Sequence, residues 1–344
     1  RRQRQMCIRD SNKSAYRALI KFTDEELDYI CRFVEEKVQT LGIQDVPIAE
    51  MHNVVEGALE KVNPVVAKSY RDYRNYKQDF VQMLDEVYKK SQSIMYIGDK
   101  ENSNTDSALV STKRSLIFNE LNKELYKKFF LTVEEIQAIR EGYIYIHDMS
   151  ARRDTMNCCL FDVKNVLSGG FEMGNLWYNE PKTLDTAFDV IGDIVLSAAS
   201  QQYGGFTVPS VDEILEPYAE KSHKKLIEKY RGLGLDEETV QKVAWADLEK
   251  EMEQGFQGWE YKFNSVSSSR GDYPFITVTA GTRTSIYGKL ATIKMLEVRK
   301  NGQGKDGHKK PVLFPKIVFL YAENLHGPGK PLEDVFEAGI ECSR

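Results

Sequence analysis

Apolar residues recur at helical spacing in the first third of the chain. Steps of three and four residues place one set of side chains on a single helix face: Ile30, Phe33, Val34 and Val38. This helix is expected to begin at Asp24, because acidic residues gather in its first turn, where the helix dipole favours negative charge. The pattern predicts an amphipathic helix with one buried face.

Two further helices are predicted behind prolines, which suit a first helical turn. The helix that begins near Pro47 turns five apolar residues inward: Met51, Val54, Val55, Leu59 and Val62. The helix that follows Pro64 runs through SYRDYRNYKQDFVQMLDEVYKK. Residues 24–95 therefore form a compact helical module with its own core.

Residues 101–116 are polar at first and form a linker that turns helical, with Asn104 and Asp106 as expected caps. Helices are then expected at 121–130 and 133–140. Together these segments join the helical module to the rest of the chain.

From about residue 143, short apolar runs alternate with helical patterns. The runs that predict strands are 143–148, 155–163, 273–280 and 312–322. The helical patterns lie at 184–202, 210–231, 236–268 and 285–300, and Gly204 and Gly205 are expected to stop the first of them. Alternating strands and helices with nearly continuous apolar strands predict an α/β fold with a parallel sheet or barrel.

Composition narrows the class of protein. The chain has 344 residues, 41% of them hydrophobic and 29% charged, with a net charge of −5, so it is globular and not a nucleic-acid coat. The sequence contains no run of 18 apolar residues, which a membrane-spanning helix would need, and no secretion signal opens the chain. We therefore expect a cytoplasmic protein that binds neither membrane nor nucleic acid.

The cysteines point to a reducing compartment. Five are scattered along the chain without a CxxC pair: Cys7, Cys31, Cys158, Cys159 and Cys342. This spacing argues against a structural zinc site within the sequence.

Both ends of the sequence look unnatural. The opening lacks an initiator Met, and QRQMCIRDS resembles translated sequencing adapter, so residues 1–11 are expected to be an artefact or a basic tail. The last residues, DVFEAGIECSR, resemble a helix stopped midway, so we expect a fragment. The expected domains are residues 12–90 and 91–344.

The most suspicious chemistry lies in the strand candidate TMNCCLFDV. Because neighbours on a strand point to opposite faces, one of Cys158 and Cys159 faces the interior and the other the helical layer, and Asn157 shares the face of Cys159. A cysteine directed into a cleft is poised for redox or hydrogen-atom chemistry. The alternative is that both thiols are small buried hydrophobes.

Other polar segments have two interpretations each. His147 and Asp148, at a predicted strand end, form either a binding site or a structural pair, and Arg152 and Arg153 either meet a phosphate or lie in a solvated turn. The glycines of SGGFEMGN (168–175) match no nucleotide-binding fingerprint and predict a tight turn. The basic segment 299–316 is a phosphate-binding or a solvated loop.

Several segments taken together resemble the anaerobic (class III) ribonucleoside-triphosphate reductases, a glycyl-radical family. They occur in family order: ENSNTDS (101–107), GYIYIHDMS (142–150), MNCCLFDVKNVLSGGFEMGN (156–175), EPKTLDTA (180–187), YGGFTVPSVDEILEPY (203–218) and PVLFPKIVF (311–319). The helical module also resembles the later part of an ATP-cone domain, although the opening strand of that domain is not present.

The resemblance implies a fold and a mechanism. The fold is a ten-stranded α/β barrel whose first half is present here, preceded by a partial ATP-cone domain. A glycyl radical outside this sequence passes to a finger-loop cysteine, whose thiyl takes the 3′ hydrogen of a ribonucleoside triphosphate. The 2′ hydroxyl leaves as water, and a cysteine on the first barrel strand helps to reduce the 2′ carbon.

The resemblance also assigns residues. Cys158 occupies the position of the strand cysteine and is the expected catalytic residue, whereas Cys159 is expected to be structural. The expected substrate-binding residues are Asn157, His147, Tyr203, Gly204, Gly205 and Thr207. Glu180 and Lys182, expected at the start of the next helix, would lie nearer the allosteric nucleotide site.

The implied cofactors and partners follow the family. They are ATP and deoxynucleotide effectors, formate (or a redoxin) as reductant, a radical-SAM activating enzyme, a second copy in a homodimer, and zinc only in a C-terminal part beyond this sequence. The chain alone is expected to be inactive. Two alternatives stay open, another glycyl-radical enzyme of the pyruvate formate-lyase type and a non-catalytic nucleotide-binding remnant.

Overall fold

The computed structural model describes residues 2–42, 46–97, 108–152, 155–266, 268 and 271–344. The chain divides into two compact units, Arg1–Lys89 and Lys90–Arg344. The segment 101–107 and Arg153, both singled out in the sequence, lie outside the described residues, as do the expected caps Asn104 and Asp106.

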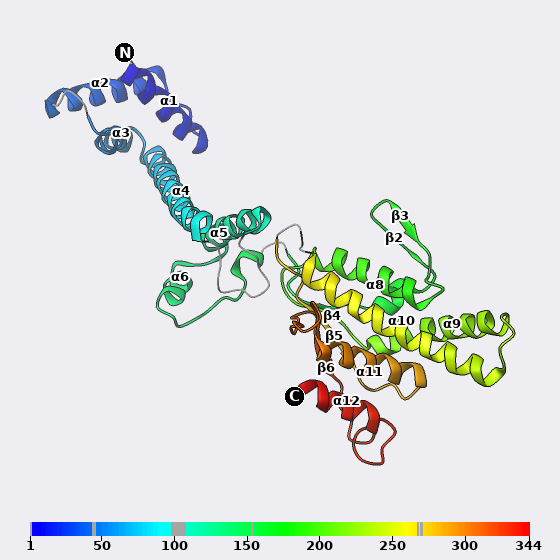
Figure 1. Cartoon of the computed structure of the whole chain (residues 1–344). Coiled ribbons are helices and arrows are strands. Elements are labelled where there is room, and N and C mark those ends of the chain that lie inside the picture. Colours follow the sequence, from blue (N-terminus) through cyan, green and yellow to red (C-terminus); the bar gives the residue numbers. More distant parts are fainter. Residues whose placement is uncertain (1, 43–45, 98–107, 153–154, 267, 269–270) are drawn as a thin grey trace. The chain divides into compact units, whose positions relative to one another are not determined.

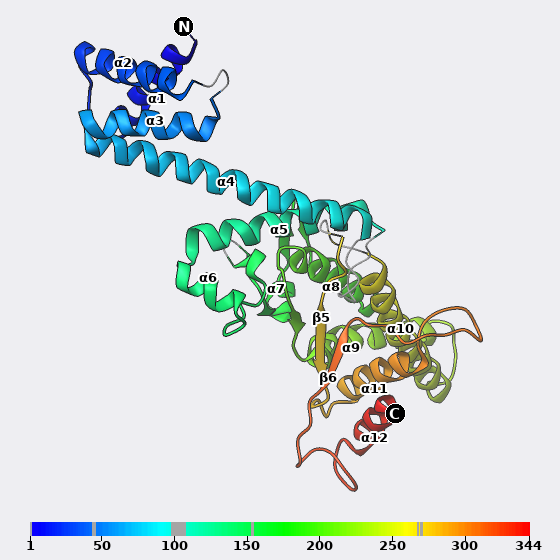
Figure 2. The ribbon, with the colours of Figure 1, turned by 90° about the vertical axis from the view of Figure 1, so that its left-hand side faces the viewer.

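The first unit is helical. Its helices are α1 (Arg2–Arg17), α2 (Asp24–Leu41), α3 (Ile48–Val62) and α4 (Pro64–Ile97), the last of which continues into the second unit. Helices α2 and α3 lie side by side (Figure 2). The predicted start of α2 is confirmed, because Thr23 and Glu26 form a capping box there.

A small apolar core holds this unit together. The core includes Ile30, Val34, Val55 and Leu59, each of which the periodicity predicted to face inward. Arg71 pairs with Glu56 at its side. The sequence pattern was sufficient here because each helix buries a single stripe of apolar side chains.

The second unit combines helices and strands (Figure 1). Its helices are α5 (Val110–Phe130), α6 (Val133–Arg140), the 3₁₀ turn η1 (Met149–Ala151), α7 (Val163–Leu167), α8 (Leu184–Ala199), α9 (Val211–Arg231), α10 (Glu237–Ser265), α11 (Ile286–Asn301) and α12 (Glu333–Ser343). Its strands are β1 (Cys159–Leu160), β2 (Phe171–Met173), β3 (Leu176–Tyr178), β4 (Phe206–Val208), β5 (Ile276–Ala280) and β6 (Lys316–Phe319).

The described residues form a parallel sheet in the order β1-β4-β5-β6, and β2 and β3 form a separate antiparallel hairpin. The register aligns Leu160 with Thr207, Thr207 with Thr277, and Thr277 with Lys316. The predicted α/β class with a parallel sheet is therefore confirmed. Strands joined in sequence order through helices give this arrangement.

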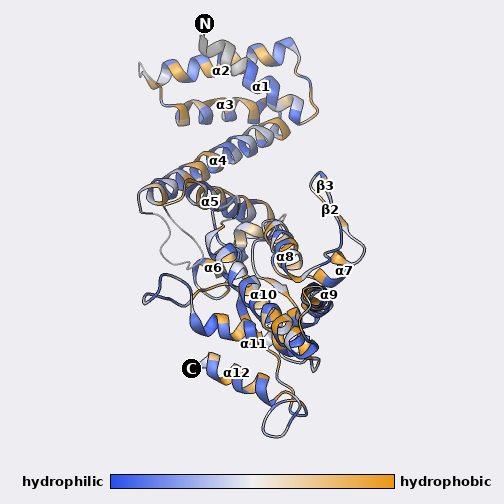
Figure 3. Ribbon diagram, turned by 45° about the vertical axis from the view of Figure 1, so that its right-hand side comes forward, coloured by the Kyte–Doolittle hydropathy of each residue, from blue (hydrophilic) through white to orange (hydrophobic). Residues whose placement is uncertain are grey.

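One face of the sheet carries the main core. Alternate strand residues, such as Phe206, Val208, Ile276 and Val278, are buried against helices α8 to α11. These helices gather on one side of the strands in Figure 1, and their surfaces alternate between apolar and polar stripes in Figure 3. The opposite strand residues, among them Leu160 and Val318, are exposed within the described part of the chain.

Three strand predictions were wrong or too long. Residues 143–148 form no strand, because Tyr143 and Tyr145 are exposed and the period-two pattern has no neighbouring strand to pair with among the described residues. The stretch 155–163 contributes only β1 and an isolated bridge between Met156 and Gln202. The stretch 312–322 contributes β6 alone, which is half exposed.

Two turn predictions also need correction. Helix α8 ends at Ala199 with Ser200 as its C-cap, so Gly204 and Gly205 do not stop it. The stretch 168–175 is more than a tight turn, since it opens a hairpin in which Gly174, at a φ of 64°, makes the reversal between β2 and β3.

Candidate active site

Cys158 lies immediately before β1, the edge strand of the described sheet. The backbone N–H of Cys159 donates to the carbonyl of Gly205 (3.1 Å) and that of Phe161 to the carbonyl of Thr207 (2.8 Å), so this segment is fixed beside β4. The Cys158 side chain is exposed, whereas Cys159 packs against the main core. The two thiols therefore point to opposite sides of the sheet, as strand geometry requires.

The glycine pair lets β4 approach this cysteine closely. The Gly204 N–H donates to the carbonyl of Asn157 (2.7 Å), and the Gly205 N–H points at the Cys158 sulfur (3.3 Å). A Cβ on Gly204 would lie 2.6 Å from the Asn157 side-chain oxygen and 3.0 Å from the Cys158 sulfur. Glycine is required there to keep the thiol beside the β4 backbone.

The side-chain oxygens of Asn157 and Gln202 are buried next to the two cysteines. Neither the Asn157 nor the Gln202 side-chain oxygen has a hydrogen-bond donor within the described residues. The Gln202 amide donates to the Cys159 sulfur, which fixes that thiol on the core side. A buried acceptor without a donor is costly and is a feature of functional sites.

Tyr203 links a second segment to the glycine pair. Its hydroxyl accepts a hydrogen bond from the buried Ser150 hydroxyl (3.2 Å), which brings η1 toward the Cys158 loop. His147, just before η1, is exposed and its imidazole lies 3.0 Å from the Asp148 carboxylate. This contact engages Nε2 of the His147 ring with the Asp148 carboxylate.

The face of the sheet that carries Cys158 also carries Thr207, which lies between Leu160 and Thr277 in the register. Phe275 and Lys316 lie on the same face, with the Lys316 ammonium 3.9 Å from the centre of the Phe275 ring. Sequence reasoning missed both residues. Their alternation with buried neighbours was visible in the strands, but their meeting across two strands depends on the register.

Glu180 and Lys182 precede α8 instead of opening it, which corrects their expected place. The Glu180 carboxylate pairs with the Lys221 ammonium on α9 (3.0 Å) and accepts the Gly169 N–H (3.4 Å). These hydrogen bonds, that of Lys221 first, lower the pKa of Glu180. Burial raises the pKa of the neighbouring Tyr218 to about 12.

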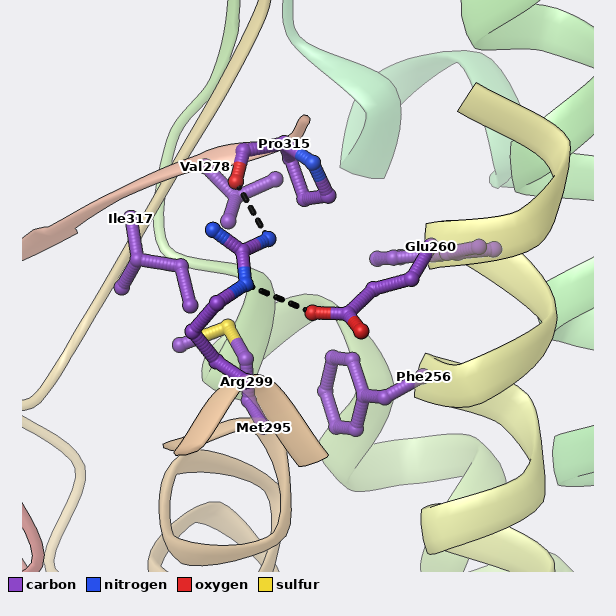
Figure 4. Close-up of a pocket in the computed structure, with 8 residues that line it drawn as sticks. Phe256, Glu260, Val278, Met295, Arg299, Pro315 and Ile317 are labelled. Atoms are coloured by element: carbon purple, nitrogen blue, oxygen red, sulfur yellow. Dashed lines mark hydrogen bonds and ion pairs between the residues drawn. The ribbon is translucent and has the colours of Figure 1, made fainter. Parts of the chain in front are cut away.

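A buried ion pair lies on the helical side of the sheet (Figure 4). Arg299 donates to Glu260 (2.7 Å) and to the carbonyl of Pro315 (2.7 Å) beside a cavity of about 10 Å³. That volume holds one water molecule and no substrate. The pair fastens β6 to α10 and α11, so we assign it a structural role.

Comparison with known families settles the class of the chain. A family model described as "Anaerobic ribonucleoside-triphosphate reductase" matches residues 101–344, which is more than half of the sequence. The chain belongs to this family. A second model, described as "ATP cone domain", matches residues 7–79.

Curated relatives of the family agree. An anaerobic ribonucleoside-triphosphate reductase of Haemophilus influenzae is 31% identical over 307 residues, which cover 87% of this chain and 43% of that protein. The protein of the same name from Enterobacteria phage T4 is 33% identical over 247 residues, or 71% of this chain and 40% of that protein. The chain thus spans less than half the length of these relatives, and a pyruvate formate-lyase type of enzyme is not favoured.

The fold agrees as well. A solved structure named "Anaerobic ribonucleotide reductase" superposes with a TM-score of 0.50 at 16% identity, covering 79% of this chain and 47% of that one. The likeness concerns the fold alone. Within the described residues, no helix is long and apolar enough to cross a membrane.

Proposed function

We propose that the chain is the first half of an enzyme that reduces ribonucleoside triphosphates to 2′-deoxyribonucleoside triphosphates for DNA synthesis in the anaerobic cytoplasm. The observation that carries the proposal is an exposed thiol, Cys158, held on the open face of a parallel sheet in a chain of the reductase family. The family's ten-stranded barrel would enclose that face.

Cys158 is the proposed catalytic residue. The glycyl radical, which the family carries outside this sequence, supplies the odd electron when present. The Cys158 thiol then supplies reducing hydrogen to the 2′ carbon as the hydroxyl leaves. Its position supports this role, because the side chain is exposed and, within the described residues, the Gly205 N–H is the hydrogen-bond donor to its sulfur.

The overall reaction balances with formate as reductant. A ribonucleoside triphosphate, formate and one proton give the 2′-deoxyribonucleoside triphosphate, water and carbon dioxide. A redoxin dithiol would supply the same two electrons and become a disulfide. We propose formate as the reductant, and a radical-SAM activating enzyme and a second copy of the chain as partners.

The neighbours of Cys158 are the proposed substrate-binding residues. Asn157 offers an oxygen without a donor, and Gly204 and Gly205 lie beside the thiol. Tyr203 precedes this glycine pair, and Thr207 on β4 lies on the same face of the sheet as Cys158. His147 is proposed to join them, because it lies three residues before Ser150, whose hydroxyl donates to Tyr203.

Regulation would involve two further regions. We propose that Glu180 and Lys182 contribute to an allosteric nucleotide site at a dimer surface, with Glu180 oriented by Lys221. The first unit, which matches the ATP-cone family, would respond to ATP and deoxynucleotides. We propose that zinc, if the whole enzyme holds it, binds outside the residues of this sequence.

A chimaera tests the proposal. Residues 101–344 would replace the matched segment of the Haemophilus influenzae relative, which supplies the remaining length. After anaerobic activation, conversion of labelled CTP to dCTP is expected with formate present. Cys158→Ser should abolish conversion and leave CTP binding intact.

Cys159→Ser is the matched control, because its thiol faces the core and contacts Gln202. It should retain most of the activity. Equal loss in both variants, or full activity of Cys158→Ser, would contradict the assignment. A chimaera with both cysteines intact that binds CTP but does not convert it would favour the alternative of a non-catalytic nucleotide-binding remnant.

A further inference from the structure

Among the residues of β1, β4, β5 and β6, Lys316 is charged, and the others are Cys, Thr or apolar residues. It pairs in register with Thr277, on the face opposite the helices, and its side chain is exposed. A cation on an otherwise uncharged sheet face attracts an anionic ligand. Within the described residues, no carboxylate lies within ion-pair distance of it.

The Lys316 side chain extends from β6 over Phe275, the residue just before β5. Its ammonium lies over the Phe275 ring at 3.9 Å, a cation–π contact that turns the side chain back along β5. A Cβ built on Gly205 would lie 3.8 Å from both the Phe275 ring and the Cys158 sulfur. Cys158, Gly205, Phe275 and Lys316 therefore form one continuous surface.

The surface separates the thiol from the cation by a considerable span. Three strand spacings, about 14 Å in total, lie between β1 and β6, and the lysine recovers part of this distance by reaching over Phe275. A one-carbon carboxylate such as formate is too short to touch both groups. A ligand that joins a reacting sugar to a polyphosphate has the required length and charge.

We propose that Lys316 binds the polyphosphate of the nucleoside triphosphate whose ribose lies at Cys158, an inference that rests on the function proposed above. The Lys316 ammonium has three hydrogen-bond donors, and the Phe275 ring beneath it limits its motion. Phosphate oxygens would therefore accept these hydrogen bonds on the side away from the ring. The Thr277 and Thr207 hydroxyls lie in the same row, between the cation and β1.

The test uses the 344-residue chain and the exposure of Cys158. Alkylation of Cys158 by iodoacetamide is followed by mass spectrometry of its peptide, with the half-buried Cys342 as internal reference. CTP should slow the reaction at Cys158, and cytidine should do so only at higher concentration. In Lys316→Met, the CTP concentration for half protection should rise about tenfold, the worth of one charge-assisted hydrogen bond. The effect of cytidine should not change.

Three variants make the result specific. Lys316→Arg should keep protection by CTP within a few-fold, Phe275→Leu should weaken it by less than Lys316→Met, and Lys330→Met, an exposed lysine beyond β6, should match the parent. Circular dichroism confirms that each variant is folded. Neither formate nor inorganic triphosphate should protect the thiol by itself.

The outcomes separate the two proposals. Equal protection by CTP in the parent and in Lys316→Met would overturn the role of Lys316 and leave the proposed function standing. No protection by CTP in the parent would overturn both. Formate protection that is lost in Lys316→Met would show a small carboxylate site and refute the polyphosphate assignment.

Discussion

The Arg299–Glu260 pair offers a sharp stability prediction. Glu260 is 4% exposed and the Arg299 side chain 17%, so both charges are largely removed from water. Glu260 also accepts from Gln303, and Arg299 from α11 holds the Pro315 carbonyl just before β6. All polar partners of the pair are thus supplied by the protein.

Arg299→Met should lower the free energy of unfolding by about 3–5 kcal/mol. The substitution leaves a buried carboxylate with only Gln303 as partner and the Pro315 carbonyl without its donor. Replacing both members, with Glu260→Leu and Arg299→Met, should cost less than the sum of the single changes, because no charge is then left buried. Lys300→Met is the control, since its pair with Glu341 is exposed and contributes at most about 1 kcal/mol.

Urea unfolding followed by tryptophan fluorescence measures the loss of stability in the second compact unit, which contains Arg299 and Glu260. The three tryptophans, Trp177, Trp245 and Trp259, all lie within Lys90–Arg344, and Trp259 adjoins Glu260. A loss below about 1 kcal/mol in Arg299→Met would refute the reasoning. So would a double variant as unstable as the two single changes added together.

Two further predictions concern the site. Gly204→Ala should destabilise the second unit by about 1–3 kcal/mol and alter the alkylation rate of Cys158, because the new Cβ would lie 2.6 Å from the Asn157 side-chain oxygen. Gly205→Ala is the control and should change neither quantity, because its Cβ would lie 3.8 Å from the nearest atoms. Equal effects of the two substitutions would contradict the close approach of Gly204 to Asn157. The Lys221 hydrogen bond lowers the pKa of Glu180, so its stabilisation is present above the ordinary pKa of about 4.5 and is lost as pH falls through the lower folded value. Melting temperatures of the parent and Glu180→Gln should therefore differ near neutral pH and converge in acid; a constant difference would exclude this linkage.

Periodicity predicted much of the fold because many elements bury one continuous stripe. Helices α2, α3, α9 and α11 begin within one or two residues of the expected positions. The side chains of Thr23 and Ser285 cap the first turns of α2 and α11. The strand at 143–148 failed for the converse reason. A period-two pattern needs a neighbouring strand, and pairing is decided by residues distant in sequence.

The family motifs made Cys158 the candidate catalytic residue from sequence, but the residues around it are known only from the tertiary structure. Strand parity already separated Cys158 from Cys159, because alternation is a local property of the backbone. Which of the two faces is open depends on where the helices pack, and that is settled by the core on the opposite side.

The sequence alone determined the family, the α/β class and the helical module, because motifs and periodic stripes are local. Only the tertiary structure decided that Lys316 reaches over Phe275, and that Glu180 pairs with Lys221. These contacts join residues about 40 positions apart, and in the first case strand register sets them. Register and helix packing are properties of the whole sheet and its core, so no local pattern could specify them.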